Sequence, residues 1–383
     1  MKAKALLLAS VFLLVLFGIL MSLSASGPQS LRIYGTPYHF LLHHLLFTGL
    51  GFLFAVVAYR IDYHFWTRIS PLVYLVAIAL LLAVFAFDPS NGARRWIRFA
   101  NLTFQSSEVA KFGLVAALAA WFSLLAPVTG KAPRASGLRA RLAAYAARHP
   151  RGNLWLLRLI VPATILGVLC VLVICEPDFG TTVLLGLTGA AMMLVCGAPW
   201  LPFAVLVALA AAGIGVLVYF DPVRLARVIS FVNPEAYPES GYQLKQALYA
   251  FINGGAFGQG LGNSVQKILY LPEAHTDFIF AIIGEELGFF ATFFILLLFA
   301  AFFCAGMRIS SRARDPEGRL LAFGITVIYA LQALINMAVV VGIAPTKGLP
   351  LPFISYGGSS FIVTIAAIGV LARIASDPDL RPR

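Results

Sequence analysis

The stretch 271–304, LPEAHTDFIFAIIGEELGFFATFFILLLFAAFFC, begins with polar residues and then becomes almost continuously apolar. A helix needs about 20 apolar residues to cross the hydrocarbon core of a bilayer. The run after Asp277 is longer than that, so the sequence predicts a membrane-spanning helix here. Its polar entrance consists of four residues in a row of five: Glu273, His275, Thr276 and Asp277.

The whole chain has the composition of a membrane protein. Of its 383 residues 60% are hydrophobic and 11% are charged, whereas soluble domains carry about 25% charged residues. A water-soluble enzyme is therefore excluded. We expect a single all-α polytopic domain over 1–383 with about ten transmembrane helices. Its apolar runs lie near 5–24, 39–59, 70–87, 108–127, 157–175, 180–197, 201–219, 276–305, 320–342 and 360–375.

Basic residues predict the orientation of these spans. The stretch MKAKALLLASVFLLVLFGILMSLSAS resembles a signal peptide, but its apolar run is long, so we expect a retained first span. A loop at about 128–156 is basic and lacks acids, which predicts a cytoplasmic location. Basic residues near both Lys2 and Arg312 agree, placing the N- and C-termini in the cytoplasm. The longest loop, about 220–275, then lies outside the cell between spans seven and eight. Within it, YQLKQALYAFINGG has an amphipathic helical pattern.

The formal net charge of +12 does not indicate nucleic-acid binding, because most Lys and Arg residues lie in loops where they orient the spans. Two outer loops nevertheless carry cations, against that rule. A polyanionic ligand on the outer face would explain them, and so would ordinary solvation. These residues are Arg94, Arg95, Arg98, Arg224, Arg227, Lys245 and Lys267. The four cysteines lie in apolar runs and show neither metal-ligand spacing nor a disulfide framework.

Asp277 lies at the predicted outer mouth of span eight. A carboxylate there either caps the helix or acts as a general base in an outward-facing cavity. Glu285 and Glu286 lie deeper in the same span. At about 100° per residue, Glu285 is rotated about 80° from Asp277 and Glu286 about 180°. At least Glu286 is therefore expected to pair with another helix.

Two further pairs of charged residues have two interpretations each. Glu108 and Lys111 have the i,i+3 spacing of an intrahelical ion pair, which would also offer a cation to an anionic substrate. Glu176 and Asp178 are weak candidates for a divalent cation such as Mg or Mn. Asp178 as the cap of the next helix is the simpler interpretation.

Two irregular segments complete the set. The stretch 253–263, NGGAFGQGLGN, is either a hinge or a nest of backbone N–H groups for phosphate. The stretch 344–360, APTKGLPLPFISYGGSS, is polar and broken by Pro and Gly, which at membrane depth indicates a water-filled cavity. A solvated turn is the alternative. The side chains expected to border this cavity are Lys347, Ser355, Tyr356, Ser359 and Ser360.

Five separated stretches together resemble one family, the SEDS proteins (shape, elongation, division and sporulation), which include FtsW, RodA and SpoVE. The stretches are NGARRWI, FQSSEVAK, EPDFGTT, GYQLKQALYAFINGGAFGQGLGNSVQKILYLPEAHTDFIFAIIGEELGF and QALINMAVVVGIAPTKGLPLPFISYGGSS. The match is spread over most of the chain. PEAHTDF and PTKGLPLP are more similar to the division member than to the elongation member. Ser106 departs from the family, which usually has Pro there.

The resemblance implies a ten-helix peptidoglycan glycosyltransferase of the bacterial inner membrane, at the septum if division-like. Such a protein polymerises lipid II on the outer leaflet with a class B penicillin-binding transpeptidase and other division membrane proteins. The resemblance makes Asp277 the catalytic carboxylate. It implies no certain cofactor. The substrate-binding candidates are Glu108, Lys111, Arg94, Arg95, Trp96, Gln243, Lys245, His275, Lys347, Ser355, Ser359 and Ser360.

Three alternatives remain at this stage. The same chemistry would serve cell elongation, as in RodA. A lipid II flippase or other transporter would place its polar groups near mid-membrane, whereas a polymerase would gather them at the outer face. A non-catalytic division scaffold would have no activity of its own.

Overall fold

The computed structural model describes residues 2–88, 94–99, 102–125, 155–233, 238–268 and 270–377. Within these residues ten apolar helical segments coincide with the ten predicted runs, which confirms the all-α polytopic fold. Seven are long enough to cross a membrane: α1 Lys2–Tyr34, α2 His39–Arg60, α5 Ser106–Leu125, η2 with α7 Leu156–Cys175, α9 Trp200–Tyr219, α12 Ile279–Arg312 and α13 Pro316–Val340. The three shorter ones are α4 with η1 Ser70–Ala86, α8 Phe179–Val195 and α14 Ser359–Ile374.

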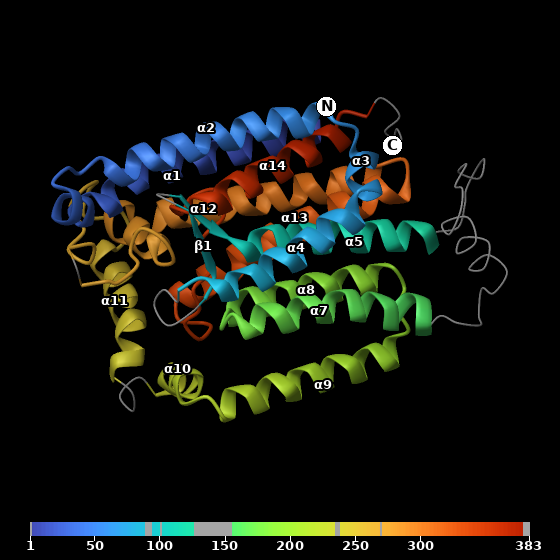
Figure 1. Cartoon of the computed structure of the whole chain (residues 1–383). Helices are drawn as coiled ribbons and strands as arrows, with labels where there is room; N and C mark the ends of the chain where they lie inside the picture. Colours follow the sequence, from blue (N-terminus) through green and yellow to red (C-terminus); the bar gives the residue numbers. More distant parts are fainter. Residues whose placement is uncertain are drawn as a thin grey trace.

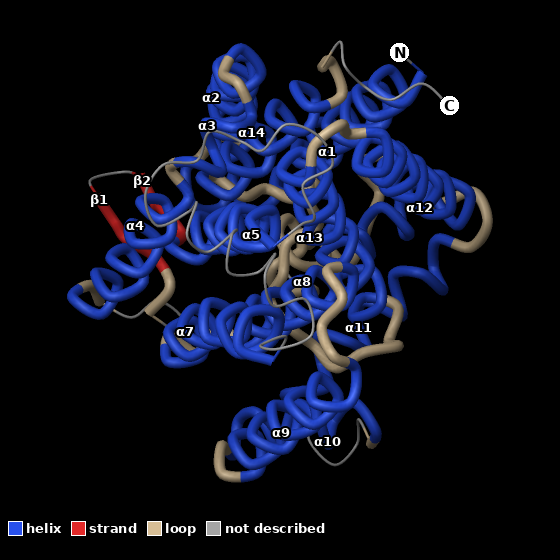
Figure 2. Tube along the Cα trace, turned by 90° about the vertical axis from the view of Figure 1, so that its right-hand side faces the viewer, coloured by secondary structure: helices blue, strands red, loops and turns tan. Residues whose placement is uncertain are grey.

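The helices run side by side along one bundle, with both termini at the same end (Figure 1). α13 lies in the middle of the bundle (Figure 2) and packs against α12, α5 and α8. It is the most enclosed of the long spans, with 72% of its apolar window buried. By contrast, α9 stands apart and only 6% of its window is buried. The bundle core is therefore built around α13.

Shorter elements gather at the end opposite to the termini. There, α10 (Pro222–Val232) and α11 (Pro238–Gly254) lie across the direction of the bundle. The α11 helix confirms the amphipathic pattern of the long loop 220–275. A two-stranded antiparallel hairpin, β1 (Trp96–Phe99) and β2 (Leu102–Gln105), was not predicted. The predicted basic loop 128–156 lies largely outside the described residues.

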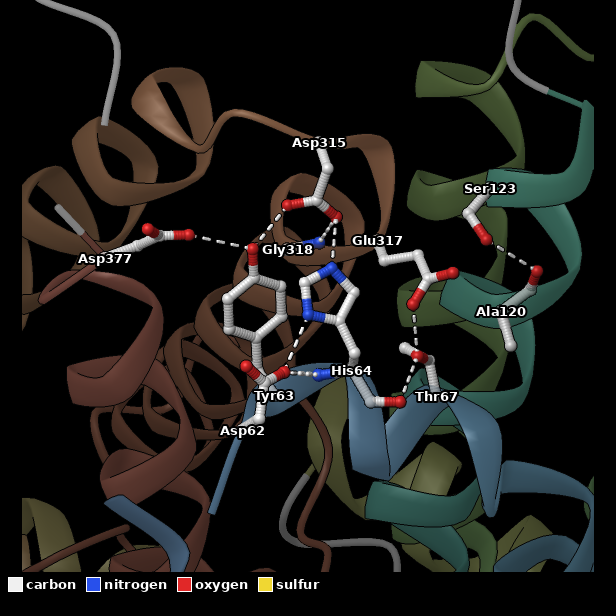
Figure 3. Close-up of polar contacts among 10 residues, drawn as sticks. All are labelled: Asp62, Tyr63, His64, Thr67, Ala120, Ser123, Asp315, Glu317, Gly318 and Asp377. Carbon is white, nitrogen blue, oxygen red and sulfur yellow. Dashed lines mark hydrogen bonds and ion pairs between the residues drawn. The ribbon is translucent and has the colours of Figure 1, made fainter. Parts of the chain in front are cut away.

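A polar network ties the turns together at the end that holds the termini (Figure 3). Tyr63, in the short helix α3 (Tyr63–Arg68), donates its hydroxyl to Asp315 and to Asp377, the latter at 3.0 Å. Asp315 also accepts from Gly318 N at 2.9 Å and so caps α13. Burial and the hydrogen bond to Asp315 raise the pKa of Tyr63 above its ordinary value, so its hydroxyl stays a donor. The network joins the α2–α3 turn to the α12–α13 turn and the C-terminal end.

The glycine-rich stretch 253–263 packs directly on the backbone of α12. A Cβ on Gly258 would lie 2.2 Å from Glu286 O, and α12 itself is kinked at Gly288, where φ is 77°. The N–H groups of Gln259 and Gly260 donate to α12 carbonyls, each at 2.9 Å. Those N–H groups are therefore occupied, and the predicted phosphate nest is wrong for this part of the stretch. The hinge interpretation stays a prediction.

The two acids within span eight hold the outer loop in place. Glu286 accepts from Ser24 of α1 at 2.7 Å and pairs with Lys267 at 2.6 Å, which confirms its expected partner on another helix. Glu285 accepts from Ser264 and from the N–H of Val265 at 3.2 Å. Both glutamates are fully buried. Lys267 is thus engaged by protein and is not available to an outer ligand.

Candidate active site

Asp277 lies in the turn that leads into α12, at the end of the bundle away from the termini. The helix begins at Ile279 and its N-cap position is Phe278, so Asp277 is not the cap. Its carboxylate accepts no hydrogen bond from the described residues and remains partly accessible, although His275 and Phe278 beside it are buried. The acid is therefore held in place by its backbone while its oxygens stay available for chemistry.

Gly348 shows what faces this carboxylate. A Cβ built on Gly348 would lie 3.0 Å from Asp277 Oδ2 and 3.9 Å from Arg95 Nη1. The carboxylate and the guanidinium therefore converge on one point, and only the missing side chain of a glycine leaves that point free. Arg95 is anchored by donating its other terminal nitrogen to the carbonyl of Pro177.

The surroundings of Asp277 raise its pKa to about 7 from an ordinary value of 3.8. Burial is the largest cause, because it penalises the charged form. The negative charges of Glu273 and Asp178 add to the increase, while the Arg95 guanidinium opposes it. A carboxylate with this pKa is ionised about half of the time at neutral pH and holds a transferred proton well.

A hollow lined by cations opens beside Gly348. Its walls come from Arg95, from the start of α8, from the end of α9, from α10 and from the segment 345–348. Arg95, Arg224, Arg227 and Lys347 all line it. These four cations come from three outer segments that are far apart in the sequence, yet they line the same hollow. Such closeness in space is what the prediction of a common anionic ligand requires.

These cations are only partly neutralised. Arg224 pairs with Asp221 at 2.9 Å, whereas Lys347 makes no ion pair with the described residues and lies 4.6 Å from the ring centroid of Phe179. Burial lowers the pKa of Lys347, and burial with the charge of Arg95 lowers that of Arg227. An anion in the hollow would relieve both effects. Four cations around one hollow are the side-chain chemistry that a phosphate or pyrophosphate group would need.

The other outer residues named as substrate contacts lie elsewhere. Arg94 is exposed and donates to Phe85 O at 3.0 Å. Trp96 is half-buried in β1 opposite Gln105. Gln243 and Lys245 are half-buried on α11. None of these four candidates lines the hollow, and their contact with substrate stays a prediction.

Glu176 and Asp178 use their oxygens within the protein. Asp178 caps α8 by accepting from Thr181 N at 3.0 Å and from Thr181 Oγ1 at 2.9 Å, which confirms the capping interpretation. Glu176 accepts from Ser106 Oγ at 3.2 Å, and burial raises its pKa to about 8. Among the described residues no three acids, histidines or cysteines gather as metal ligands. This donor set does not fit a resident Mg or Mn ion.

Glu108 and Lys111 form the intrahelical pair, with Glu108 Oε2 2.7 Å from Lys111 Nζ. Their side chains are only 3% and 2% exposed. The ammonium also donates to Gln332 of α13 at 2.8 Å. Neither residue lines the hollow, so the pair lies inside the protein beneath the site.

The serines of the segment 344–360 shape its backbone. Ser355 Oγ donates to Thr276 O at 2.6 Å and accepts from Leu351 N at 2.8 Å. Ser359 Oγ accepts from Gln105 N at 3.1 Å, and Ser360 Oγ donates to Gly357 O at 2.7 Å. Of the side chains predicted to border a cavity here, Lys347 does so, whereas these buried hydroxyls hold the wall together.

His275 is packed as part of the same wall. Its ring centroid lies 5.1 Å from that of Phe40 and 5.9 Å from that of Tyr356, and its carbonyl accepts from Tyr356 N at 3.2 Å. Burial lowers the pKa of His275, so its imidazole is neutral at pH 7. Its direct contact with a substrate stays a prediction.

Three residues of the site lie in a stretch that carries the family resemblance but were not singled out from the sequence: Gln332, Asn336 and Gly348. Asn336 Nδ2 donates to Asp277 O at 2.8 Å and to Leu349 O at 2.7 Å. The two amides are one turn apart in the otherwise apolar stretch LQALINMAVV. Polar side chains within a span are a signal of function or pairing, and that signal would have identified them.

Comparison with known proteins places this geometry in context. Residues 4–379 match the family model FTSW_RODA_SPOVE, described as "Cell cycle protein". The chain is 39% identical to a probable peptidoglycan glycosyltransferase FtsW of Coxiella burnetii, covering 96% of this chain and 94% of that one. It is 40% identical to the protein of that name in Marinobacter nauticus, covering 99% and 90%.

Two solved structures have a similar fold. One is a chain from a peptidoglycan synthase complex that coordinates polymerization and crosslinking, with TM-score 0.75, 24% identity and 97% of each chain covered. The other is the rod shape determining protein RodA of Thermus thermophilus, with TM-score 0.68, 23% identity and 97% and 96% covered. At these identities the likeness concerns the fold.

Proposed function

Because the chain belongs to the FtsW/RodA/SpoVE family of cell cycle proteins, we propose that it is a peptidoglycan glycosyltransferase. It polymerises lipid II into glycan strands at the outer face of the cytoplasmic membrane during cell division. Lipid II carries its disaccharide-peptide on undecaprenyl pyrophosphate, so its headgroup lies just outside the bilayer while its tail stays in lipid.

One observation supports this function above the others. The Asp277 carboxylate and the Arg95 guanidinium converge beside Gly348, at the edge of a hollow lined by four cations. A polymerase of this substrate needs a base for the acceptor hydroxyl and positive charge for the pyrophosphate. The site offers both within one small region.

The reaction then follows from the geometry. Asp277 takes the proton of the 4-hydroxyl of N-acetylglucosamine on the acceptor. That oxygen attacks C1 of the donor N-acetylmuramic acid and inverts the anomeric centre. The bond between C1 and the phosphate oxygen breaks, and undecaprenyl pyrophosphate leaves with the electron pair. The developing charge is stabilised by Arg95, Arg224, Arg227 and Lys347. A positioned base contributes about 10²–10⁴-fold to such a rate.

The position of the polar groups favours a polymerase over a transporter. α10, which lines the cationic hollow, and the start of α12, which follows Asp277, lie at the end of the bundle away from the termini (Figure 1). Glu285 and Glu286, which lie deeper in α12, already accept hydrogen bonds within the protein, from Ser264 and Ser24 respectively. These two acids therefore do not form the polar binding site at mid-membrane depth that a flippase would need. Asp277 favours an enzyme over a scaffold, because its pKa is raised to about 7 and its carboxylate accepts no hydrogen bond from the described residues, unlike that of Glu176.

A role in division is favoured by the relatives. Those named FtsW are 35–40% identical over nearly the full chain, whereas the RodA structures are 22–23% identical. We place the protein at the division septum together with a class B penicillin-binding transpeptidase and other division membrane proteins. The similarity to a chain of a synthase complex supports the transpeptidase partner.

The test is lipid II polymerisation by the purified protein with its transpeptidase. Wild type is expected to form glycan strands, and Asp277→Asn is expected to form none while keeping its fold and its partner. The matched control is Glu273→Gln, an isosteric loss of an exposed neighbouring charge, which should stay active. Normal polymerisation by a well-folded Asp277→Asn would falsify the assignment.

A further inference from the structure

Two buried side-chain amides on α13, those of Gln332 and Asn336, bond to the backbone of the candidate site. Gln332 and Asn336 are each 2% exposed. Being four residues apart, they lie on the same face of the helix. Both reach out of the helix to the main chain of the segment that carries Lys347 and Gly348.

Asn336 joins the two halves of the site. Its Nδ2 has two hydrogens, which go to Asp277 O at 2.8 Å and Leu349 O at 2.7 Å. Because both partners are carbonyls, only the NH₂ side of the amide fits there. One carboxamide therefore fixes the backbone of Asp277 relative to the residue next to Gly348.

Gln332 extends the same support by one turn. Its Nε2 donates to Pro350 O at 2.8 Å, and its Oε1 accepts from Lys111 Nζ at 2.8 Å. Lys111 can only donate and a carbonyl can only accept, so the ammonium fixes which way the amide points. Glu108, 2.7 Å away, holds the ammonium in turn.

The segment needs this support because it has little of its own. Residues 345–351 form neither helix nor strand. Backbone without regular structure keeps a functional position only where its surroundings fix it. Here the carbonyls of Leu349 and Pro350 are fixed by the two amides, directly after Lys347 and Gly348.

We propose that Glu108 and Lys111 act on the reaction without touching substrate: they orient Gln332, which with Asn336 holds the Lys347–Gly348 segment against Asp277. This inference rests on the proposed function. It makes Glu108, Lys111, Gln332 and Asn336 positioning residues, and it replaces the interpretation of Lys111 as a cationic substrate contact.

The test is a double-mutant cycle on polymerisation with Lys111→Met, Gln332→Met and the double variant. If Lys111 acts through Gln332, each single variant lowers kcat by about 10²-fold, since displacing a reacting group by 1 Å costs that much. KM for lipid II stays close to wild type. The kcat of the double variant should lie within about threefold of the kcat of the less active single variant, because the effects of residues that act as one unit are not additive.

Contrary results are equally clear. Multiplicative losses in the double variant, with a raised KM in Lys111→Met, would mean that Lys111 contacts substrate, and unchanged activity in all three would also overturn the proposal. Lys111→Met leaves Glu108 buried and unpaired, so it is also made with Glu108→Gln to remove both charges. Asn336→Leu tests the second amide independently, and we expect it to lower kcat. Binding of the transpeptidase partner at the wild-type level shows that this variant is folded.

Failure of this inference is distinguishable from failure of the proposed function. If wild type polymerises lipid II and Asp277→Asn does not, the function stands whatever the cycle shows. If wild type is inactive with its partner, or Asp277→Asn is active, the function itself fails.

Discussion

The pH dependence of polymerisation gives the sharpest test of the site. An ordinary aspartate, with a pKa near 3.8, is fully ionised throughout the neutral range. The structure raises the pKa of Asp277 to about 7, chiefly through burial. Because the ionised form is the base, the rate should rise as the pH passes through 7.

The expected size follows from the titration. With a pKa of about 7 the ionised fraction is roughly one tenth at pH 6, one half at pH 7 and nine tenths at pH 8. Between pH 6 and 8 the rate should therefore increase about tenfold, whereas an unshifted acid would give a flat profile over that range.

Two substitutions move the midpoint in opposite directions. The negative charge of Glu273 disfavours ionisation of Asp277, so Glu273→Gln lowers the midpoint. The positive charge of Arg95 favours ionisation, so Arg95→Gln raises the midpoint, measured relative to that variant's own lower plateau. The assay is the initial rate of strand formation at lipid II concentrations well below KM, from pH 5.5 to 8.5, because kcat/KM reports the pKa of the free enzyme. A flat wild-type profile, or a midpoint that neither substitution moves, would refute the reasoning.

Three further changes have defined outcomes. Gly348→Ala places a methyl group 3.0 Å from Asp277 Oδ2; kcat should fall about 10-fold or more because the carboxylate must move, with unchanged thermal unfolding, and full activity would show that the point is not used. Lys267→Met leaves Glu286 buried without its cation; unfolding in detergent should be easier by about 3–5 kcal/mol, and adding Glu286→Gln should restore part of this loss. Tyr63→Phe removes two hydroxyl bonds to carboxylates far from the site; it should cost about 1–2 kcal/mol of stability and leave kcat unchanged, so a drop in kcat would contradict a purely structural role.

Apolar runs were sufficient to predict the ten helices, because spans of this length have no alternative structure in lipid. The orientation rule drew attention to the outer cations, since positive charge on the translocated side opposes it. Asp277 was singled out by its position at the mouth of span eight, and its catalytic role came from the family resemblance. The structure then brought Arg95, Arg224, Arg227 and Lys347 together around one hollow.

Other features depend on tertiary contacts that a linear pattern does not contain. The strands 96–99 and 102–105 are short, and their register is set by pairing, as of Trp96 with Gln105. The N–H groups of the glycine-rich stretch looked free for phosphate, yet α12 accepts two of them because Gly258 permits close approach to Glu286 O. The role of Asn336 depends on the closeness of Asp277 O and Leu349 O in the folded chain, which the sequence alone does not reveal.

The arrangement of Ser24, Lys267 and Glu286 also bears on how the chain is made. Ser24 and Lys267 emerge from the ribosome before Glu286, and Lys267 must be transferred to the outer side before the following span settles in lipid. An acid left alone in that span would oppose insertion by about 3 kcal/mol. Closing the loop onto this span therefore removes that penalty, because Ser24 and Lys267 supply the partners that the buried Glu286 carboxylate needs.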